Sequence, residues 1–186
     1  MRNGRGTAWI PFAVKPLLLV LALAAAADRC RADPTGKEVG AIAHTLGFVD
    51  GIPHIGTVRV AVIFDPVDSV AADSARTTAA ALCKTDGPGS ASLAAAAVPA
   101  DALAGAGPVD AFLLMPNAGH FAGAIVQEAQ RRHLVTVSSD PQCLADRTCV
   151  LWVTAEPRVA VTLDTKLAQS LAVRISPIFA MMVKRR

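Results

Sequence analysis

Residues 58–64 read VRVAVIF, and the turn-forming pair Asp65-Pro66 follows directly. Val and Ile predominate in this run, and β-branched side chains favour an extended backbone. A short apolar run that ends at a turn signal predicts a strand. Because the run is almost continuously apolar, it indicates a strand that is buried on both faces, as in a parallel sheet.

Helical and extended patterns alternate on either side of this strand. Apolar residues at spacings of three and four indicate helices, whereas short apolar runs between turn residues indicate strands. These patterns predict helices over residues 39–49, 69–84, 121–132 and 165–172, and strands over residues 91–98, 109–115 and 133–138. Such alternation implies a parallel sheet with helices on both faces.

The C-terminal part departs from this alternation. Two β-like runs, residues 149–154 and 158–163, are joined by Ala155-Glu156-Pro157, which is typical of a hairpin. We interpret the basic run Lys184-Arg185-Arg186 as a frayed, solubilising tail. The expected fold is α/β: a single Rossmann-like (flavodoxin-like) domain with a mostly parallel sheet and a C-terminal β-hairpin plus helix.

The N-terminus has the pattern of a secretory signal peptide. Arg2 and Arg5 precede an apolar stretch whose strongest part, residues 16–27, is short for a membrane span. Small residues follow, so we expect cleavage after Ala27 or after Ala32. An uncleaved membrane anchor is the alternative. Export would place the protein in an oxidising compartment.

Removal of residues 1–32 as a signal peptide changes the charge balance. The chain has 18 Lys and Arg against 15 Asp and Glu, and the leader holds five and one of these, which leaves 13 and 14. A net charge of −1 gives no electrostatic attraction for nucleic acid. Residues 33–186 have the length of one ordinary domain.

The spacing of Cys143 and Cys149 is compatible with three kinds of site. A metal site needs further ligands, and neither His120 nor His133 has a common ligand spacing. A redox-active pair usually reads C-x-x-C at the start of a helix. A structural disulfide would close a loop of about seven residues, and the sequence favours it. Cys83 is expected to be a small buried residue, with an intermolecular disulfide as the alternative.

Polar residues follow three of the predicted strands: Asp65, Asn117 and Ser138. Ligands of parallel α/β sheets bind at the carboxyl ends of the strands, so these residues form a candidate small-molecule cleft. No G-x-G-x-x-G or Walker motif occurs, and we expect no nucleotide or other cofactor. Ser138, Ser139 and Asp140 follow a strand, with His120 and His133 nearby in the sequence. A Ser–His–Asp triad drawn from these residues would lack the G-x-S-x-G elbow, so we do not predict an enzyme.

Apolar side chains near the C-terminus form a candidate partner interface. A Trp at the edge of a hairpin is a common interface anchor, and flexible Met side chains adapt to partners, although both are also common in cores. The candidate interface residues are Trp152, Arg158, Ile178, Phe179, Met181 and Met182.

The order of these segments resembles the YfiR/HmsC family of periplasmic proteins. The matching stretches are TLGFVDGIP (residues 45–53), VRVAVIFDP (58–66), VDAFLLM (109–115), LVTVSS (134–139) and the stretch from VLWVTAEP to IFAMMV (150–183). The chain departs from the family at Val109-Asp110, where members often carry a cysteine. The pair Cys143 and Cys149 falls where members carry a C-terminal disulfide.

The resemblance implies a regulator that is not an enzyme. Such proteins are often homodimers that restrain the periplasmic part of a membrane-bound diguanylate cyclase, and redox or envelope stress would release it. A periplasmic small-molecule-binding protein with a Rossmann-like lobe is the alternative, supported by the strand-end residues Asp65 and Asn117.

Overall fold

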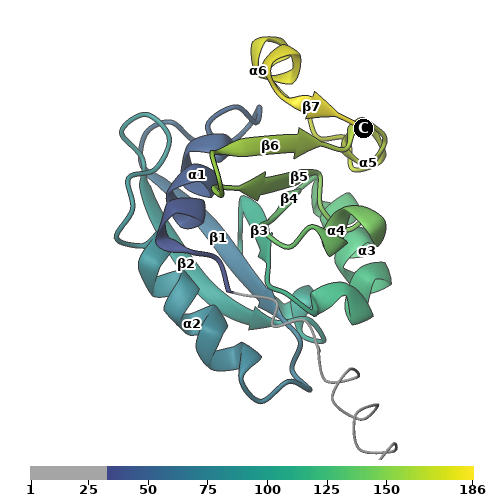
Figure 1. Cartoon of the computed structure of the whole chain (residues 1–186). Helices are drawn as coiled ribbons and strands as arrows, with labels where there is room; N and C mark the ends of the chain where they lie inside the picture. Colours follow the sequence, from purple (N-terminus) through teal and green to yellow (C-terminus); the bar gives the residue numbers. More distant parts are fainter. Residues whose placement is uncertain (1–32) are drawn as a thin grey trace, which may run out of the picture. The chain divides into compact units, whose positions relative to one another are not determined.

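A computed structural model describes residues 33–186, and the predicted signal peptide lies outside the described residues. One seven-stranded sheet, in the order β2-β1-β3-β4-β5-β6-β7, is the framework (Figure 1). Its strands are β1 (Thr57–Phe64), β2 (Ser92–Pro99), β3 (Ala111–Leu114), β4 (Val135–Ser138), β5 (Leu151–Thr154), β6 (Ala160–Leu163) and β7 (Lys184–Arg185). The predicted α/β class with a mostly parallel sheet is confirmed.

Six α-helices and two 3-10 turns accompany the sheet in the described part of the chain. They are α1 (Gly36–Leu46), α2 (Ala71–Leu82), η1 (Leu103–Gly105), η2 (Ala118–Phe121), α3 (Ala122–Arg132), α4 (Gln142–Ala145), α5 (Thr165–Ser170) and α6 (Pro177–Met182). Among residues 33–186, no helix combines the length and hydrophobicity that crossing a membrane requires.

Strand β1 lies inside the sheet, with parallel neighbours on both edges. Val60 of β1 is paired with Ala95 of β2 on one side and with Ala111 of β3 on the other. From Val60 to Phe64 every β1 side chain is buried, which explains the uninterrupted apolar run in the sequence. The strand order 2-1-3-4-5 is that of flavodoxin-like folds, in which the chain reverses its direction across the sheet between β1 and β3.

The helices cover the two faces of this sheet. Helix α2 connects β1 to β2 and α3 connects β3 to β4, so the two crossovers proceed in opposite directions across the sheet. Since parallel crossovers are right-handed, α2 and α3 pack on opposite faces. Helix α1 contacts α2 and β5. It begins at a capping box in which the Glu38 backbone N–H donates to Thr35 Oγ1 at 3.2 Å.

The C-terminal residues extend the sheet beyond the predicted hairpin. Strand β6 is antiparallel to β5, as the sequence predicts, and β7 then pairs in parallel with β6. The prediction of a frayed tail is therefore wrong. The Arg186 backbone N–H donates to the Leu163 carbonyl oxygen at 2.9 Å, and Thr165 Oγ1 donates to the Arg186 carbonyl oxygen at 2.8 Å.

Helix α6 is attached to the body of the domain through the segment that follows α1. The Phe179 ring is buried and stacks on the Phe48 ring, with 4.3 Å between the ring centroids and an angle of 6° between the planes. The Ser176 backbone N–H donates to the Phe48 carbonyl oxygen at 2.8 Å, and the Asp50 backbone N–H donates to the Arg174 carbonyl oxygen at 2.9 Å. These contacts hold the start of α6 in place.

Candidate functional site

The carboxyl end of β1 carries a buried carboxylate. Only 4% of Asp65 is exposed, and its Oδ1 accepts the Val67 backbone N–H at 2.8 Å. Its Oδ2 lies 2.9 Å from Nδ1 of His120, which belongs to η2 after strand β3. The pKa of the Asp65 carboxyl is held below its usual value, chiefly by the His120 hydrogen bond, while burial acts in the opposite direction.

The three predicted cleft residues lie at the ends of neighbouring strands, but no single hollow described here is lined by all three. Asn117 has a left-handed backbone (φ 69°) and lines a hollow of about 150 Å³ together with Asp68 and Ser74. Ser138 lines a separate hollow of only about 10 Å³, and neither hollow includes Asp65. The shared cleft predicted from the sequence stays a prediction, and Asn117 borders the larger of these two hollows.

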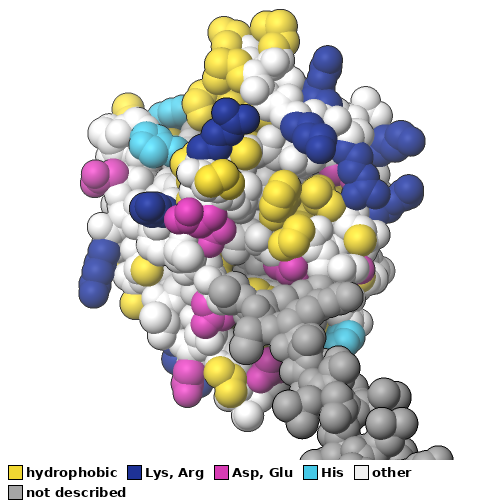
Figure 2. Space-filling model, viewed as in Figure 1, with side chains coloured by type: hydrophobic (Ala, Val, Ile, Leu, Met, Phe, Trp, Pro, Cys, Tyr) yellow, Lys and Arg dark blue, Asp and Glu magenta, His cyan; other side chains and the backbone are white. Residues whose placement is uncertain are grey.

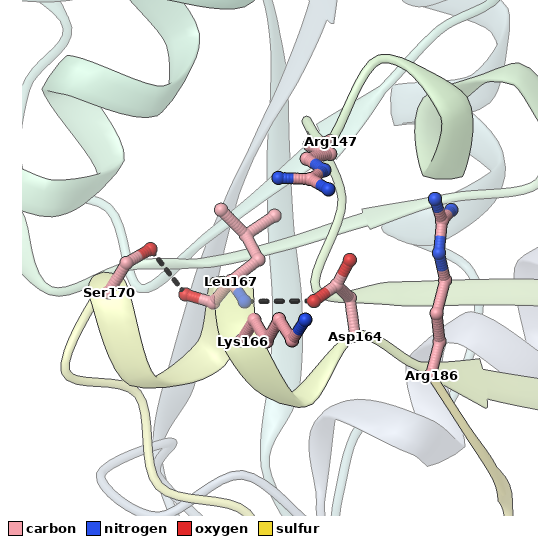
Figure 3. A pocket seen from close by; sticks show the side chains of 6 residues that line it. All are labelled: Arg147, Asp164, Lys166, Leu167, Ser170 and Arg186. Atoms are coloured by element: carbon pink, nitrogen blue, oxygen red, sulfur yellow. Dashed lines mark hydrogen bonds between the residues drawn. The ribbon is translucent and has the colours of Figure 1, made fainter.

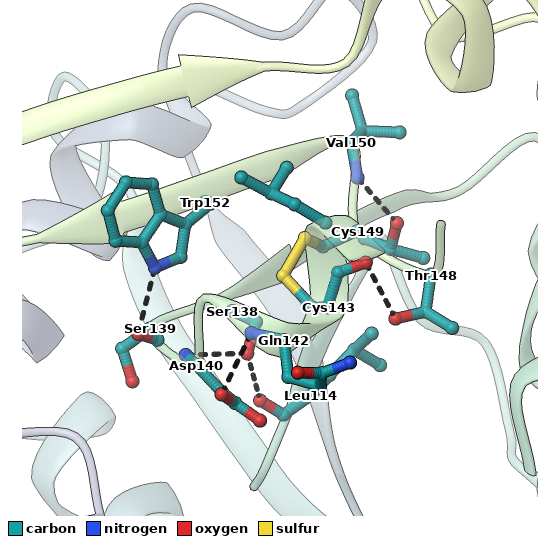
Figure 4. Close-up of a disulfide and its surroundings, with 12 residues drawn as sticks. Leu114, Ser138, Ser139, Asp140, Gln142, Cys143, Thr148, Cys149, Val150 and Trp152 are labelled. Carbon is teal, nitrogen blue, oxygen red and sulfur yellow. Dashed lines mark hydrogen bonds between the residues drawn. A yellow bond between two sulfur atoms is a disulfide. The ribbon is translucent and has the colours of Figure 1, made fainter. Parts of the chain in front are cut away.

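The Ser138 hydroxyl is engaged in backbone hydrogen bonds (Figure 4). It donates to the Leu114 carbonyl oxygen at 2.8 Å and accepts the Asp140 N–H at 3.1 Å. His120 faces Asp65, and His133 Nδ1 lies 3.3 Å from the Leu171 carbonyl oxygen. Within the described residues, no hydrogen bond joins Ser138 to either histidine, and its hydroxyl is bonded to backbone groups instead.

Cys143 and Cys149 form a disulfide, and this alternative is confirmed (Figure 4). Cys143 belongs to α4 and Cys149 lies two residues before β5, with 5.4 Å between their Cα atoms. Both residues are buried. The Thr148 backbone N–H donates to the Cys143 carbonyl oxygen at 2.9 Å, which closes the same loop a second time. The disulfide therefore fixes the approach of the chain to β5.

Cys83 differs from its expectation as a buried residue, because it is exposed and free at the end of α2. Its Sγ accepts the Ala95 backbone N–H at 3.2 Å, at the outer edge of the edge strand β2. The thiol therefore accepts a backbone hydrogen bond that a further strand would accept if the sheet continued beyond β2. An intermolecular disulfide stays a prediction.

The candidate interface residues fall into exposed and buried groups. Ile178, Met181 and Met182 of α6 are 67%, 74% and 69% exposed, and Figure 2 shows apolar side chains gathered at the top of the molecule, where Figure 1 places α6. We call these three residues the α6 patch. Phe179 faces inward onto Phe48 and supports the patch from below.

The other two candidate interface residues belong to the hairpin. Trp152 of β5 is half-buried, and its Nε1–H donates to the Ser139 carbonyl oxygen at 3.0 Å. Arg158 is exposed in the turn between β5 and β6. Trp152 therefore lies beside the loop that begins at Ser139, directly after Ser138 at the end of β4.

Two features of these sites were missed by sequence reasoning. The first is the partnership of His120 with Asp65, although both residues follow strands that proved to be neighbours. The second is Phe48, whose ring supports α6 across a separation of more than 100 residues along the chain.

A scan of protein-family models finds none that matches the chain, and a search of curated proteins finds no match either.

Asp65 should make stability depend on pH. Its folded-state pKa is depressed, so its contribution is present above the unfolded pKa of about 3.9 and is lost as pH falls through the folded-state pKa. We expect Asp65→Asn to lower the free energy of unfolding by ~1–3 kcal/mol at pH 6, with a smaller difference at pH 3. Urea denaturation at both pH values measures this. Asp101→Asn, at an exposed carboxylate, is the control, and a difference that does not change with pH would contradict the role of Asp65.

The disulfide should contribute measurably to stability. Closing a loop of about seven residues is worth roughly 2–2.5 kcal/mol in the chain-entropy model. The double variant Cys143→Ala/Cys149→Ala should lose this amount in urea denaturation without reductant. Cys83→Ala, which leaves the loop of the disulfide closed, should lose less stability than the double variant, because the Ala95 N–H that bonds to Cys83 lies at an exposed edge and can bond to water instead. Equal unfolding midpoints for wild type and the double variant would refute the prediction.

Proposed function

We propose that this protein is an exported regulator that binds and restrains a membrane-bound signalling enzyme, a diguanylate cyclase, through that enzyme's periplasmic part. The observation that carries the proposal is the α6 patch, in which three large apolar side chains are directed to solvent from one short helix. The family resemblance of the sequence supports the identity of the partner, the periplasmic location and a homodimeric state.

The α6 patch has the properties of a protein-binding surface. Contiguous exposed apolar side chains favour association, because binding removes their surface from water. Met is enriched in such surfaces, since its flexible thioether adapts to the shape of a partner. The stacked Phe48 and Phe179 rings and the Ser176 hydrogen bond hold the helix beneath the patch. A supported helix loses little conformational freedom when a partner binds.

A continuous set of contacts connects the patch to the disulfide. Helix α4 contains Cys143, and its Leu144 carbonyl oxygen accepts a hydrogen bond of 2.6 Å from Nη1 of Arg186. Arg186 follows β7, which begins two residues after α6 ends. Reduction of the disulfide would loosen α4 and with it the support of the C-terminal segment. Because both sulfur-bearing residues are buried, reduction requires a local opening, so the proposed redox response is slow.

The proposal is tested by cross-linking in intact cells followed by affinity capture and mass spectrometry. The tagged wild-type protein should capture a membrane protein with a diguanylate cyclase domain. Met181→Lys should reduce capture by about tenfold or more, because a charge in an apolar contact is costly to desolvate. The matched control is Val67→Lys, which changes another highly exposed apolar residue, in the loop after β1. Wild-type capture should fall after treatment with reductant.

Cyclic-di-GMP levels give the functional readout of the same experiment. Cells that carry Met181→Lys should behave like cells that lack the protein, with raised cyclic-di-GMP, whereas Val67→Lys should behave like wild type. Unchanged cyclic-di-GMP in cells without the protein would contradict the proposal. So would equal capture of the cyclase by Met181→Lys and wild type.

A small-molecule-binding function is the second candidate, and the hollow beside Asn117 favours it. It lies between the ends of β1 and β3, where the direction of the chain across the sheet reverses and where ligands of such folds bind. Trp152 contacts Ser139 at the end of the next strand, so it reports on this edge of the sheet.

A titration with periplasmic metabolites should then change the fluorescence of Trp152, the one Trp among residues 33–186. A ligand that binds in the hollow should lose affinity by about tenfold in Ser74→Phe, because the larger side chain fills the space and adds no second Trp to the readout. Thr77→Phe, at an exposed position of the same helix that does not line the hollow, is the control. A fluorescence change that is identical in both variants would exclude the hollow as the site.

A further inference from the structure

A third hollow, of about 240 Å³, lies beside β7, at the opposite end of the sheet order from β2. Figure 3 shows the side chains that line it. It is bordered by three segments that are distant in sequence: the loop after α4, helix α5 and the end of β7. The residues that line it are Arg147, Asp164, Lys166, Leu167, Ser170 and Arg186. Figure 2 shows Lys and Arg side chains gathered over this part of the molecule.

Positive charge predominates in this hollow. Figure 3 shows the charged ends of Arg147, Lys166 and Arg186 around the carboxylate of Asp164. In the part of the chain that the structure describes, none of these three cations forms an ion pair. Arg131 and Arg174, by contrast, each lie beside a carboxylate. Three cationic side chains and the one carboxylate of Asp164 leave an excess of positive charge around one space, and a bound anion would offset that excess.

The backbone of the hollow is fixed before any ligand arrives. Arg147 lies inside the loop that the disulfide closes, and its backbone is left-handed, with φ 53°. The Arg186 side chain donates to the Leu144 carbonyl oxygen at 2.6 Å, and its own carbonyl oxygen is held by Thr165. A planar guanidinium can donate to two oxygens of one oxyanion at once. The volume is below that of a typical drug-sized pocket, so the ligand group is small.

Asp164 limits which oxyanion can bind. Its Oδ1 accepts the Leu167 backbone N–H at 2.8 Å and thereby caps α5. Figure 3 shows the second carboxylate oxygen directed away from Leu167, on the side of Arg147. This oxygen would repel a fully ionised anion, but it can accept a hydrogen bond from a P–OH group. Hydrogenphosphate and singly ionised phosphate monoesters carry such a group, whereas sulfate does not.

The geometry points to a site for a phosphate group at this hollow, in which Arg147, Lys166 and Arg186 bind the phosphate oxygens and Asp164 accepts its P–OH hydrogen. The source is either a soluble phosphate compound or the exposed phosphomonoester of a lipid headgroup. The site is separate from the α6 patch and does not depend on the proposed regulatory function.

Isothermal titration of the whole exported protein with inorganic phosphate at low ionic strength tests the site. Binding should be saturable. Arg147→Gln and Lys166→Gln should each weaken it by about tenfold or more, since each removes hydrogen bonds to a charged group. Neither side chain makes a hydrogen bond to another described residue, so both variants should fold. Arg158→Gln, which removes an exposed charge elsewhere, should bind like wild type. Equal affinity in all four proteins would overturn the site.

Two further measurements define the ligand. Sulfate should bind at least about tenfold more weakly than phosphate, and Asp164→Asn, which still caps α5, should bring the two affinities together. An unchanged preference in this variant would overturn the role of Asp164. Flotation with vesicles of phosphatidylcholine, with and without phosphatidic acid, separates the sources. Binding only to phosphatidic acid vesicles, lost in Lys166→Gln, supports a lipid source. Failure to bind phosphate or these vesicles would overturn the proposal.

Discussion

Strand β1 is paired on both edges and covered on both faces, and the positions of the other elements follow from this arrangement. Helix α2 connects β1 to β2 and α3 connects β3 to β4 in the opposite direction across the sheet, which places α2 on one face and α3 on the other. The two crossovers diverge from β1 and β3, so the loops after these strands face each other. That constraint brings His120 to Asp65 across 55 positions of sequence.

The extent of successful prediction differs between the core and the C-terminal extension. Runs such as residues 58–64 and 109–115 are apolar because they are buried, so their pattern reports both secondary structure and burial. Strand β7 has no such pattern. It is built from Lys184 and Arg185, and backbone hydrogen bonds to β6 create it. A two-residue strand of exposed basic side chains cannot be distinguished from a tail by hydropathy.

The candidate sites show the same division. The disulfide could be expected from cysteine spacing because its loop is local. The strand-end residues could be placed at one edge of the sheet, because parallel strands share a direction. The contacts that individual side chains make could not be predicted. The Ser138 hydroxyl is hydrogen-bonded to the backbone of Leu114 and Asp140, and the Phe179 ring stacks on Phe48. Such partnerships depend on side-chain positions within an ångström or two, which hydropathy patterns do not encode.

The exposed features with potential for binding lie mainly outside the doubly wound core. The strand ends of the core use their polar groups internally, as the paired Asp65 and the doubly bonded Ser138 show. After β5 the chain turns antiparallel into β6, and α5 and α6 then connect β6 to its parallel neighbour β7 at the edge of the sheet. Each of these six-residue helices buries only one or two side chains, Leu167 and Ala168 in α5 and Phe179 in α6. They can present apolar side chains on one and basic side chains on the other, while β7, Phe48 and the disulfide loop hold both to the core.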